Sequence, residues 1–170
     1  MTRLPTLSTV IAVLTLCLLA LVPRAVAGDK DTDFERILNM GMTEMTREAQ
    51  QVLESRYPEE NWKEYEFPSY VYTSEPVETG YKIAVKEPEL LEHFKCYCFC
   101  DAMGHADLRW CFLKEGELEK GFDPHGADCN VCYGQAMMAL LWQEEGIAPE
   151  KMTEGYEQKF EKLIRRFGDQ

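Results

Sequence analysis

Six of the seven cysteines of this chain lie between residues 96 and 132, in a pattern that could bind a metal. The densest part is Cys96-Tyr97-Cys98-Phe99-Cys100, and Cys129-x-x-Cys132 follows further along. Alternate residues of an extended segment point to the same side, so we expect the first three sulfurs to point together, with Tyr97 and Phe99 directed towards the core. Cysteines two residues apart are badly placed to bond each other. The run therefore needs partners elsewhere, which are either other sulfurs or a soft metal ion.

A histidine stands at helical spacing from the second cysteine group. His125, Cys129 and Cys132 occupy positions i, i+4 and i+7, which predicts one stripe of a helix. Cys129 would lie near the positive end of that helix, which favours the thiolate over the thiol. The stripe is compatible with a shared metal ion and also with a helical C-x-x-C disulfide.

A second histidine extends the first group to the spacing C-x-C-x-C-x4-H-x5-C, which ends at Cys111. Two cysteine groups, each with its own histidine, indicate a metal site more strongly than either group alone. The candidate ligands are Cys96, Cys98, Cys100, His105, Cys111, His125, Cys129 and Cys132.

The number of ligands favours copper over zinc. Six thiolates and two imidazoles exceed the four ligands of a structural zinc ion. Closely spaced thiolates suit Cu(I), because one sulfur can bridge several ions. We therefore expect a polynuclear Cu(I) site, with zinc as the second choice. An iron–sulfur cluster matches by ligand type but is difficult to export, and c-type haem is disfavoured because Tyr133 follows the C-x-x-C pair.

Two other functions use the same cysteines. An even number of cysteines in an exported chain is compatible with three disulfides that staple an interaction module. A thiol-disulfide oxidoreductase with Cys129 as the attacking thiolate is the other possibility, although no βαβ pattern surrounds the pair. Sequence motifs of serine hydrolases, zinc peptidases and phosphate-binding loops do not occur, so catalysis has little support.

The first 27 residues have the features of a cleaved signal peptide. Arg3 precedes an apolar run from Val10 to Val22, and Ala25-Val26-Ala27 is a small-residue cleavage site. Cys17 follows a leucine, which does not suit lipoprotein processing. We expect residues 28–170 to form a single exported domain without a membrane span, in the periplasm or outside the cell.

The chain is acidic, with a formal net charge of −12, which becomes −14 once Arg3 and Arg24 are removed with the leader. Such a surface argues against nucleic acid and anionic lipid as partners and suits cations. The expected partners are metal ions and another exported metal-handling protein.

Hydrophobic spacing predicts a mainly α, small helical domain. An aromatic-rich, irregular stretch lies at residues 59–73, and we expect the irregular cysteine-rich segment to pack on the helix that carries H-x3-C-x2-C. Helices are predicted at residues 33–56, from Ser74, from Pro88, at 124–145 and from Pro149 to 167.

The cysteine and histidine pattern resembles that of a bacterial family. The residues that carry the resemblance are Cys96 to Cys100, His105, Leu108, Cys111-Phe112, Asp123, His125-Gly126, Cys129 and Cys132. Between Tyr70 and Leu140, this order is similar to that of the exported, often lipid-anchored PCYCGC-motif proteins, which have no firmly established activity. Lys95 replaces the proline of that motif and Phe99 its glycine, and phenylalanine tolerates a positive φ less well than glycine. The resemblance implies an exported protein with these site residues, and the sequence as a whole indicates copper storage, delivery or detoxification.

Overall fold

The computed structural model describes residues 29–167, except for the side chains of residues 101 and 102. The predicted signal peptide, 1–27, with Cys17, lies outside the described residues. The described chain is helical and contains no strand, which confirms the mainly α prediction. The α-helices are α2 (Lys30–Asn39), α3 (Met42–Arg56), α4 (Glu75–Lys86), α5 (Pro88–Glu92), α6 (His125–Asp128), α7 (Asn130–Glu144), α8 (Pro149–Lys159) and α9 (Glu161–Phe167). Short 3-10 turns lie at Trp62–Tyr65, Ser69–Thr73, Cys100–Met103, Leu108–Cys111, Lys114–Gly116 and Leu118–Lys120.

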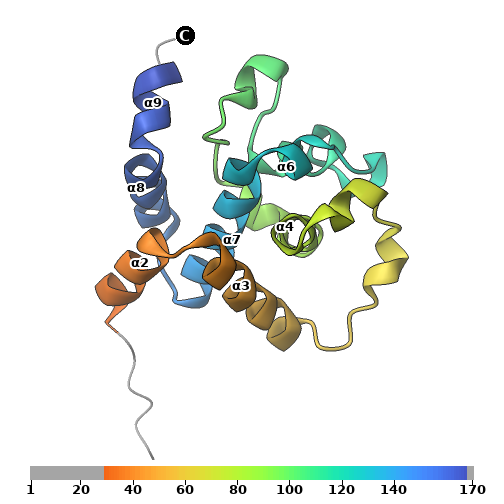
Figure 1. Ribbon diagram of the computed structural model, residues 1–170, viewed down its shortest axis with the longest axis horizontal. Coiled ribbons are helices and arrows are strands. Elements are labelled where there is room, and N and C mark those ends of the chain that lie inside the picture. The colour runs from red at the N-terminus through yellow and green to blue at the C-terminus, as the bar shows by residue number, and fades with distance from the viewer. Residues whose placement is uncertain (1–28, 168–170) are drawn as a thin grey trace, which may run out of the picture.

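Helix α7 runs through the centre of the fold, with α2, α3, α4 and α8 around it (Figure 1). Its central residues, from Gly134 to Trp142, are all buried, as expected for a helix covered on every side. Helix α4 approaches it closely, because a Cβ built on Gly80 would lie 2.7 Å from the Cβ of Tyr133. Helix α7 therefore carries Cys132 into the interior from a position fixed by several neighbours.

Three helices begin at the serine or proline where the sequence predicted a helix start. Ser74 is the N-cap of α4, with Pro76 in the first turn, and α5 and α8 begin at Pro88 and Pro149. Proline suits a first turn because its missing N–H has no partner there in any case. The aromatic stretch before α4 forms two 3-10 turns, and the rings of Tyr65 and Phe67 stack with centroids 5.6 Å apart.

Three predicted helices are each divided into two, which corrects the sequence prediction. The helix expected at 33–56 breaks at Met40, whose backbone is extended (φ −64°, ψ 140°) and whose side chain is only 5% exposed. The last helix breaks at Phe160, which stacks on Tyr97 with ring centroids 5.6 Å apart. At Met40 the break lets the side chain turn into the core, and at Phe160 it lets a half-buried ring pack against the core. In both places burial outweighs continued helical hydrogen bonding.

The third break separates the residues that carry the candidate site. The helix expected at 124–145 is interrupted at Cys129, which is extended (φ −128°, ψ 110°) and serves as the N-cap of α7. Helix α6 packs closely against Phe112, because a Cβ built on Gly126 would lie 2.5 Å from a carbon of the Phe112 ring.

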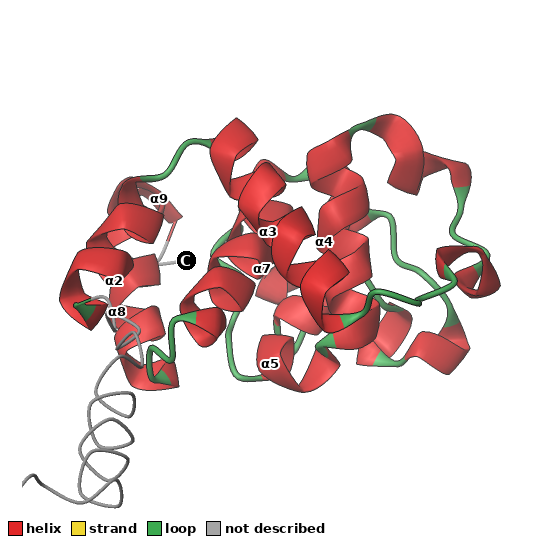
Figure 2. Ribbon diagram, turned by 90° about the horizontal axis from the view of Figure 1, so that it is seen from below, coloured by secondary structure: helices red, strands yellow, loops and turns green. Residues whose placement is uncertain are grey.

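Figure 2 shows the same fold turned by 90°. No helix of the described chain is long and apolar enough to cross a membrane.

Candidate metal centre

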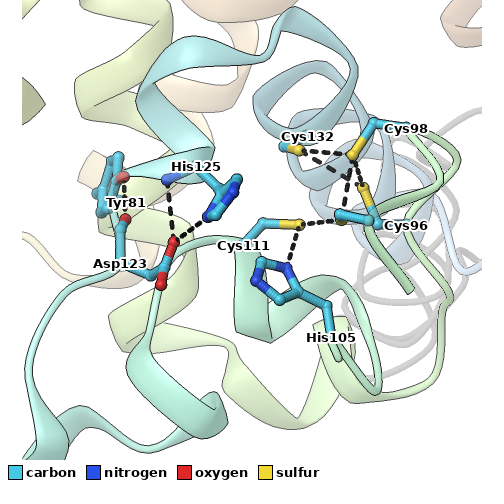
Figure 3. A network of polar contacts seen from close by, with 9 residues as sticks. Tyr81, Cys96, Cys98, His105, Cys111, Asp123, His125 and Cys132 are labelled. Carbon is cyan, nitrogen blue, oxygen red and sulfur yellow. Dashed lines mark hydrogen bonds and ion pairs between the residues drawn. The ribbon is translucent and has the colours of Figure 1, made fainter. Parts of the chain in front are cut away.

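Three separate segments bring the cysteine sulfurs together beside the first half of α7 (Figure 3). The segment after α5 supplies Cys96, Cys98 and Cys100, and the 3-10 turn Leu108–Cys111 supplies Cys111. Cys132 comes from the first turn of α7. Cys100, Cys111 and Cys132 are buried, whereas Cys96, Cys98 and Cys129 are half-buried. The predicted packing of the cysteine-rich segment on this helix is what the structure shows.

The sulfurs of the first group form a compact set with Cys132. The Sγ atom of Cys98 lies 3.1 Å from those of Cys96 and Cys100, and 3.6 Å from that of Cys132. The Sγ atoms of Cys96 and Cys132 are 3.5 Å apart. Together with Cys111, these residues supply four sulfurs (Cys96, Cys98, Cys111 and Cys132) that all lie within 4.8 Å of one another. Four sulfurs at such distances could hold one metal ion.

A second set of donors shares Cys111 with the first. The Sγ atom of Cys111 lies 3.5 Å from that of Cys100 and 3.7 Å from Nδ1 of His105. The donor atoms of Cys100, His105 and Cys111 lie within 4.8 Å of one another. The six cysteines of the described residues are all free thiols, and the distances between the contacting sulfurs exceed the disulfide bond length of about 2.05 Å.

The histidine end of the site differs from the predicted stripe. Because the chain is extended at Cys129, His125 does not share a helix with Cys132, and the i, i+4, i+7 prediction is wrong. The His125 ring instead lies perpendicular to that of His105, with centroids 4.8 Å apart. Asp123 Oδ1 lies 2.7 Å from His125 Nδ1 and accepts the His125 backbone N–H at 3.0 Å. His105, Asp123 and His125 thus form a third group of possible ligands.

Hydrogen bonds among the thiols divide them into two classes. The hydrogen bond with Cys100 lowers the pKa of Cys98 well below its usual range, and the hydrogen bond with Cys111 lowers the pKa of Cys100 to about 3. The pKa values of Cys96, Cys111 and Cys132 are raised, because each thiol donates towards a neighbouring sulfur, Cys100 first.

Cys129 is the outlying thiol of the cluster. A hydrogen bond with Cys132 lowers its pKa, but the interaction with Cys98 and burial outweigh that bond, and the net shift is upward. The backbone N–H of Cys132 at the end of α7 does lower the pKa of Cys129, as expected, but the Cys98 thiol and burial outweigh it.

Comparison with known proteins places the pattern in a family. The model of a family described as proteins of unknown function with a PCYCGC motif matches residues 18–164. The chain belongs to this PCYCGC family. The match extends well beyond the stretch from Tyr70 to Leu140 that carries the motif residues. No curated protein and no solved structure matches the chain.

The conformation of Phe99 shows why the PCYCGC motif has a glycine at this position. Phe99 has φ +63°, in the left-handed region that glycine adopts without strain. The segment is therefore a turn rather than the extended run that alternation predicted, although Tyr97 is buried as expected. The Phe99 ring is half-buried, not in the core, and contacts Phe167 of α9 with centroids 5.9 Å apart. The turn aims all three sulfurs of the motif towards α7.

Glycine at position 99 should be more stable than alanine there. Both substitutions remove the contact with Phe167, but only glycine removes the cost of a left-handed backbone. We expect F99G to exceed F99A in unfolding free energy by about 1 kcal/mol, which is the lower end of the usual penalty. Urea unfolding of the two metal-free variants measures the difference. Equal stability would mean that residue 99 is not left-handed in solution.

Gln135 is a site residue that the sequence analysis missed. Its buried side chain accepts the Tyr97 N–H at 3.2 Å and donates to the Lys95 carbonyl at 2.8 Å, so it holds the chain on both sides of Cys96. The backbone carbonyl of Gln135 also accepts a hydrogen bond from the Tyr156 hydroxyl at 2.9 Å. A signal was available, because Gln135 is the lone polar residue in the otherwise apolar run from Gly134 to Trp142. A polar residue inside such a run needs a buried partner.

We call the two side-chain hydrogen bonds of Gln135, to the Tyr97 N–H and the Lys95 carbonyl, the Gln135 clamp. Its removal should lower the stability of the fold and the metal affinity of the site. Q135L leaves a backbone N–H and a carbonyl without their partner, which should cost about 3 kcal/mol of unfolding free energy. Metal affinity should fall about 10- to 100-fold, as it does when supporting residues of a metal site are lost. Q158L, at an exposed position of α8, is the control and should change neither quantity. Wild-type stability and affinity in Q135L would contradict the clamp.

Proposed function

We propose that this protein is an exported metal-binding protein that holds Cu(I) in a polynuclear thiolate site. The ligands are Cys96, Cys98, Cys100, Cys111, Cys129 and Cys132, with His105 and His125 at the margin. The observation that carries the proposal is the continuous network of free thiols from Cys132 to Cys111, with neighbouring sulfurs 3.1–3.6 Å apart.

The spacing of the sulfurs supports direct bonding to metal ions. Two thiolates on one ion, each at about 2.3 Å, can lie at most about 4.6 Å apart. Every recorded sulfur contact of the network is shorter than this limit. Cys98 contacts three sulfurs, and Cys111 contacts the Cys100 sulfur on one side and Nδ1 of His105 on the other. Both are therefore suited to bridge adjacent ions, and bridging by thiolate favours Cu(I) over a single zinc ion.

Electrostatics support the same assignment. Without a cation, the network keeps several thiols protonated, because ionised sulfurs at such short distances repel one another. Binding of Cu(I) replaces those protons with positive charge at the centre of the cluster. The acidic surface of the chain favours approach of cations as well.

The proposed role is copper storage, delivery or detoxification outside the cytoplasm. The predicted leader, 1–27, is the reason for placing the protein in the periplasm or outside the cell. In that compartment the natural exchange partner is another exported metal-handling protein. Zinc is the second candidate metal.

Titration with Cu(I) under reducing, oxygen-free conditions tests the proposal. The purified protein should take more than one Cu(I) per chain from the bicinchoninate complex, and native mass spectrometry should show the same number. Its thiols should resist alkylation when loaded and react after the metal is removed. A protein that is isolated six hydrogens light, without alkylatable thiols, and that binds no Cu(I) after reduction would be a disulfide-stapled module instead.

A further inference from the structure

The donor atoms change in type from one end of the cluster to the other. Cys96, Cys98 and Cys132 offer only sulfur. Cys111 is next to a ring nitrogen of His105, and His125 beyond it is paired with the carboxylate of Asp123. In Figure 3 the two imidazoles lie between Asp123 and the sulfurs. Thiolates select soft ions such as Cu(I), whereas imidazole accepts several borderline metals, so the two ends differ in chemistry.

A second ion fits at the junction of the two ends. A metal bound to sulfur at about 2.3 Å and to nitrogen at about 2.0 Å can join donors as far as about 4.3 Å apart. Cys111 Sγ and His105 Nδ1 are 3.7 Å apart, and Cys100 Sγ lies 3.5 Å from Cys111 Sγ. Both separations from Cys111 meet the requirement, and all three donor atoms lie within 4.8 Å of one another. Cys111 is shared with the four-sulfur group, so the two positions are adjacent.

His125 is placed to receive ions from solution. Its side chain is 42% exposed, whereas Cys100 and Cys111 are fully buried. The Asp123 carboxylate holds Nδ1, which leaves the other ring nitrogen available to a metal.

Asp123 is itself held by the fold. Its carbonyl accepts the hydroxyl of the buried Tyr81 at 2.5 Å, and its N–H donates to the Phe112 carbonyl at 2.9 Å. The backbone of Asp123 is thus held at its carbonyl and at its N–H. Asp123 can therefore orient the His125 ring without moving.

We propose that the cluster contains a second metal position of unlike chemistry, formed by Cys100, Cys111 and His105, which ions reach through His125 oriented by Asp123. This inference rests on the proposed metal-binding function. In the transfer, Cu(I) first exchanges a ligand of its carrier for the His125 nitrogen. It then bonds to the Cys100 thiolate and to Cys111, whose thiol proton passes to water, while its bonds to His125 and to the remaining carrier ligand break. Copper remains Cu(I) throughout, and no electron is transferred.

Stopped-flow transfer of Cu(I) from its bicinchoninate complex tests the entry route. H125A should slow the transfer about tenfold, the lower range for loss of a supporting contact at a metal site. D123A should slow it similarly, whereas D123N, which retains an acceptor oxygen for His125, should restore the wild-type rate. H93A, an exposed histidine outside the cluster, is the control. A wild-type transfer rate in H125A would overturn the route. Binding of one Cu(I) fewer by H125A would also overturn it, because His125 would then be a fixed ligand.

Titration with Co(II) tests the second position independently. Thiolate-to-cobalt charge-transfer bands and ligand-field bands distinguish an all-sulfur ion from one with a nitrogen ligand. The wild-type protein should show two successive spectra, and H105A should lack the one with nitrogen. A single all-sulfur spectrum in the wild type would overturn the second position and leave the proposed function intact. Failure to bind either Cu(I) or Co(II) would reject both.

Discussion

Replacement of Cys98 with serine is expected to lower Cu(I) affinity more than about 100-fold and to reduce the number of ions bound per chain. Loss of a residue that only supports a metal site costs up to about 100-fold, and loss of a bridging ligand should cost more. The Cys98 sulfur lies within 3.6 Å of the sulfurs of Cys96, Cys100 and Cys132, so one substitution interrupts the network at its centre. A serine hydroxyl is a harder ligand that stays protonated at neutral pH. Competition with bicinchoninate measures both quantities.

Cys129 offers a matched comparison. It is half-buried like Cys98 but is the outlying thiol of the cluster. C129S should have a smaller effect on Cu(I) affinity, and serine at this position can also cap α7, which Cys129 does not do with its side chain. Equal losses in the two variants would show that the sulfurs do not share one network.

Loading with Cu(I) is expected to raise the unfolding free energy by at least about 4 kcal/mol. A ligand at a thousandfold excess over its dissociation constant contributes about this much when only the folded state binds it. The effect depends on the fold because the sulfurs come from three segments, around Cys98, Cys111 and Cys132, that meet only in the folded chain. For a chain of this size the melting temperature should rise by at least about 10 °C. Calorimetry of metal-free and loaded protein under reducing conditions measures the shift.

The C98S variant serves as the control for this measurement. Its metal-free form should melt near the wild-type temperature, because Cys98 is half-buried and serine fills a similar space. On addition of Cu(I), its melting temperature should rise much less than that of the wild type. The same melting temperature with and without Cu(I) in the wild type would contradict a site that is assembled by folding.

Much of the local structure could be predicted from the sequence. Proline and serine mark the starts of α4, α5 and α8, because a first helical turn has free N–H groups whatever the rest of the chain does. These features depend on residues close in sequence, so the sequence alone was sufficient.

The breaks at Met40, Cys129 and Phe160 could not be predicted in this way. Helical spacing continues through each of them, and only contacts with distant segments favour the interruption. The break at Cys129 matters most for the site, because it moves His125 away from Cys132 and towards His105. His125, Cys129 and Cys132 therefore have the spacing i, i+4, i+7 in the sequence, but they do not lie on one face of a single helix.

The sequence by itself determined which donors the site has: six thiols, two imidazoles and the residues around them, in the order of the PCYCGC family. Only the tertiary structure decided how they meet, through the left-handed turn at Phe99, the clamp of Gln135 and the support of Asp123 for His125. The physical reason is that ligand type and ligand position depend on interactions of different range along the chain. Ligand chemistry belongs to each side chain, whereas a distance of 3–4 Å between atoms many residues apart is set by the packing of the whole core.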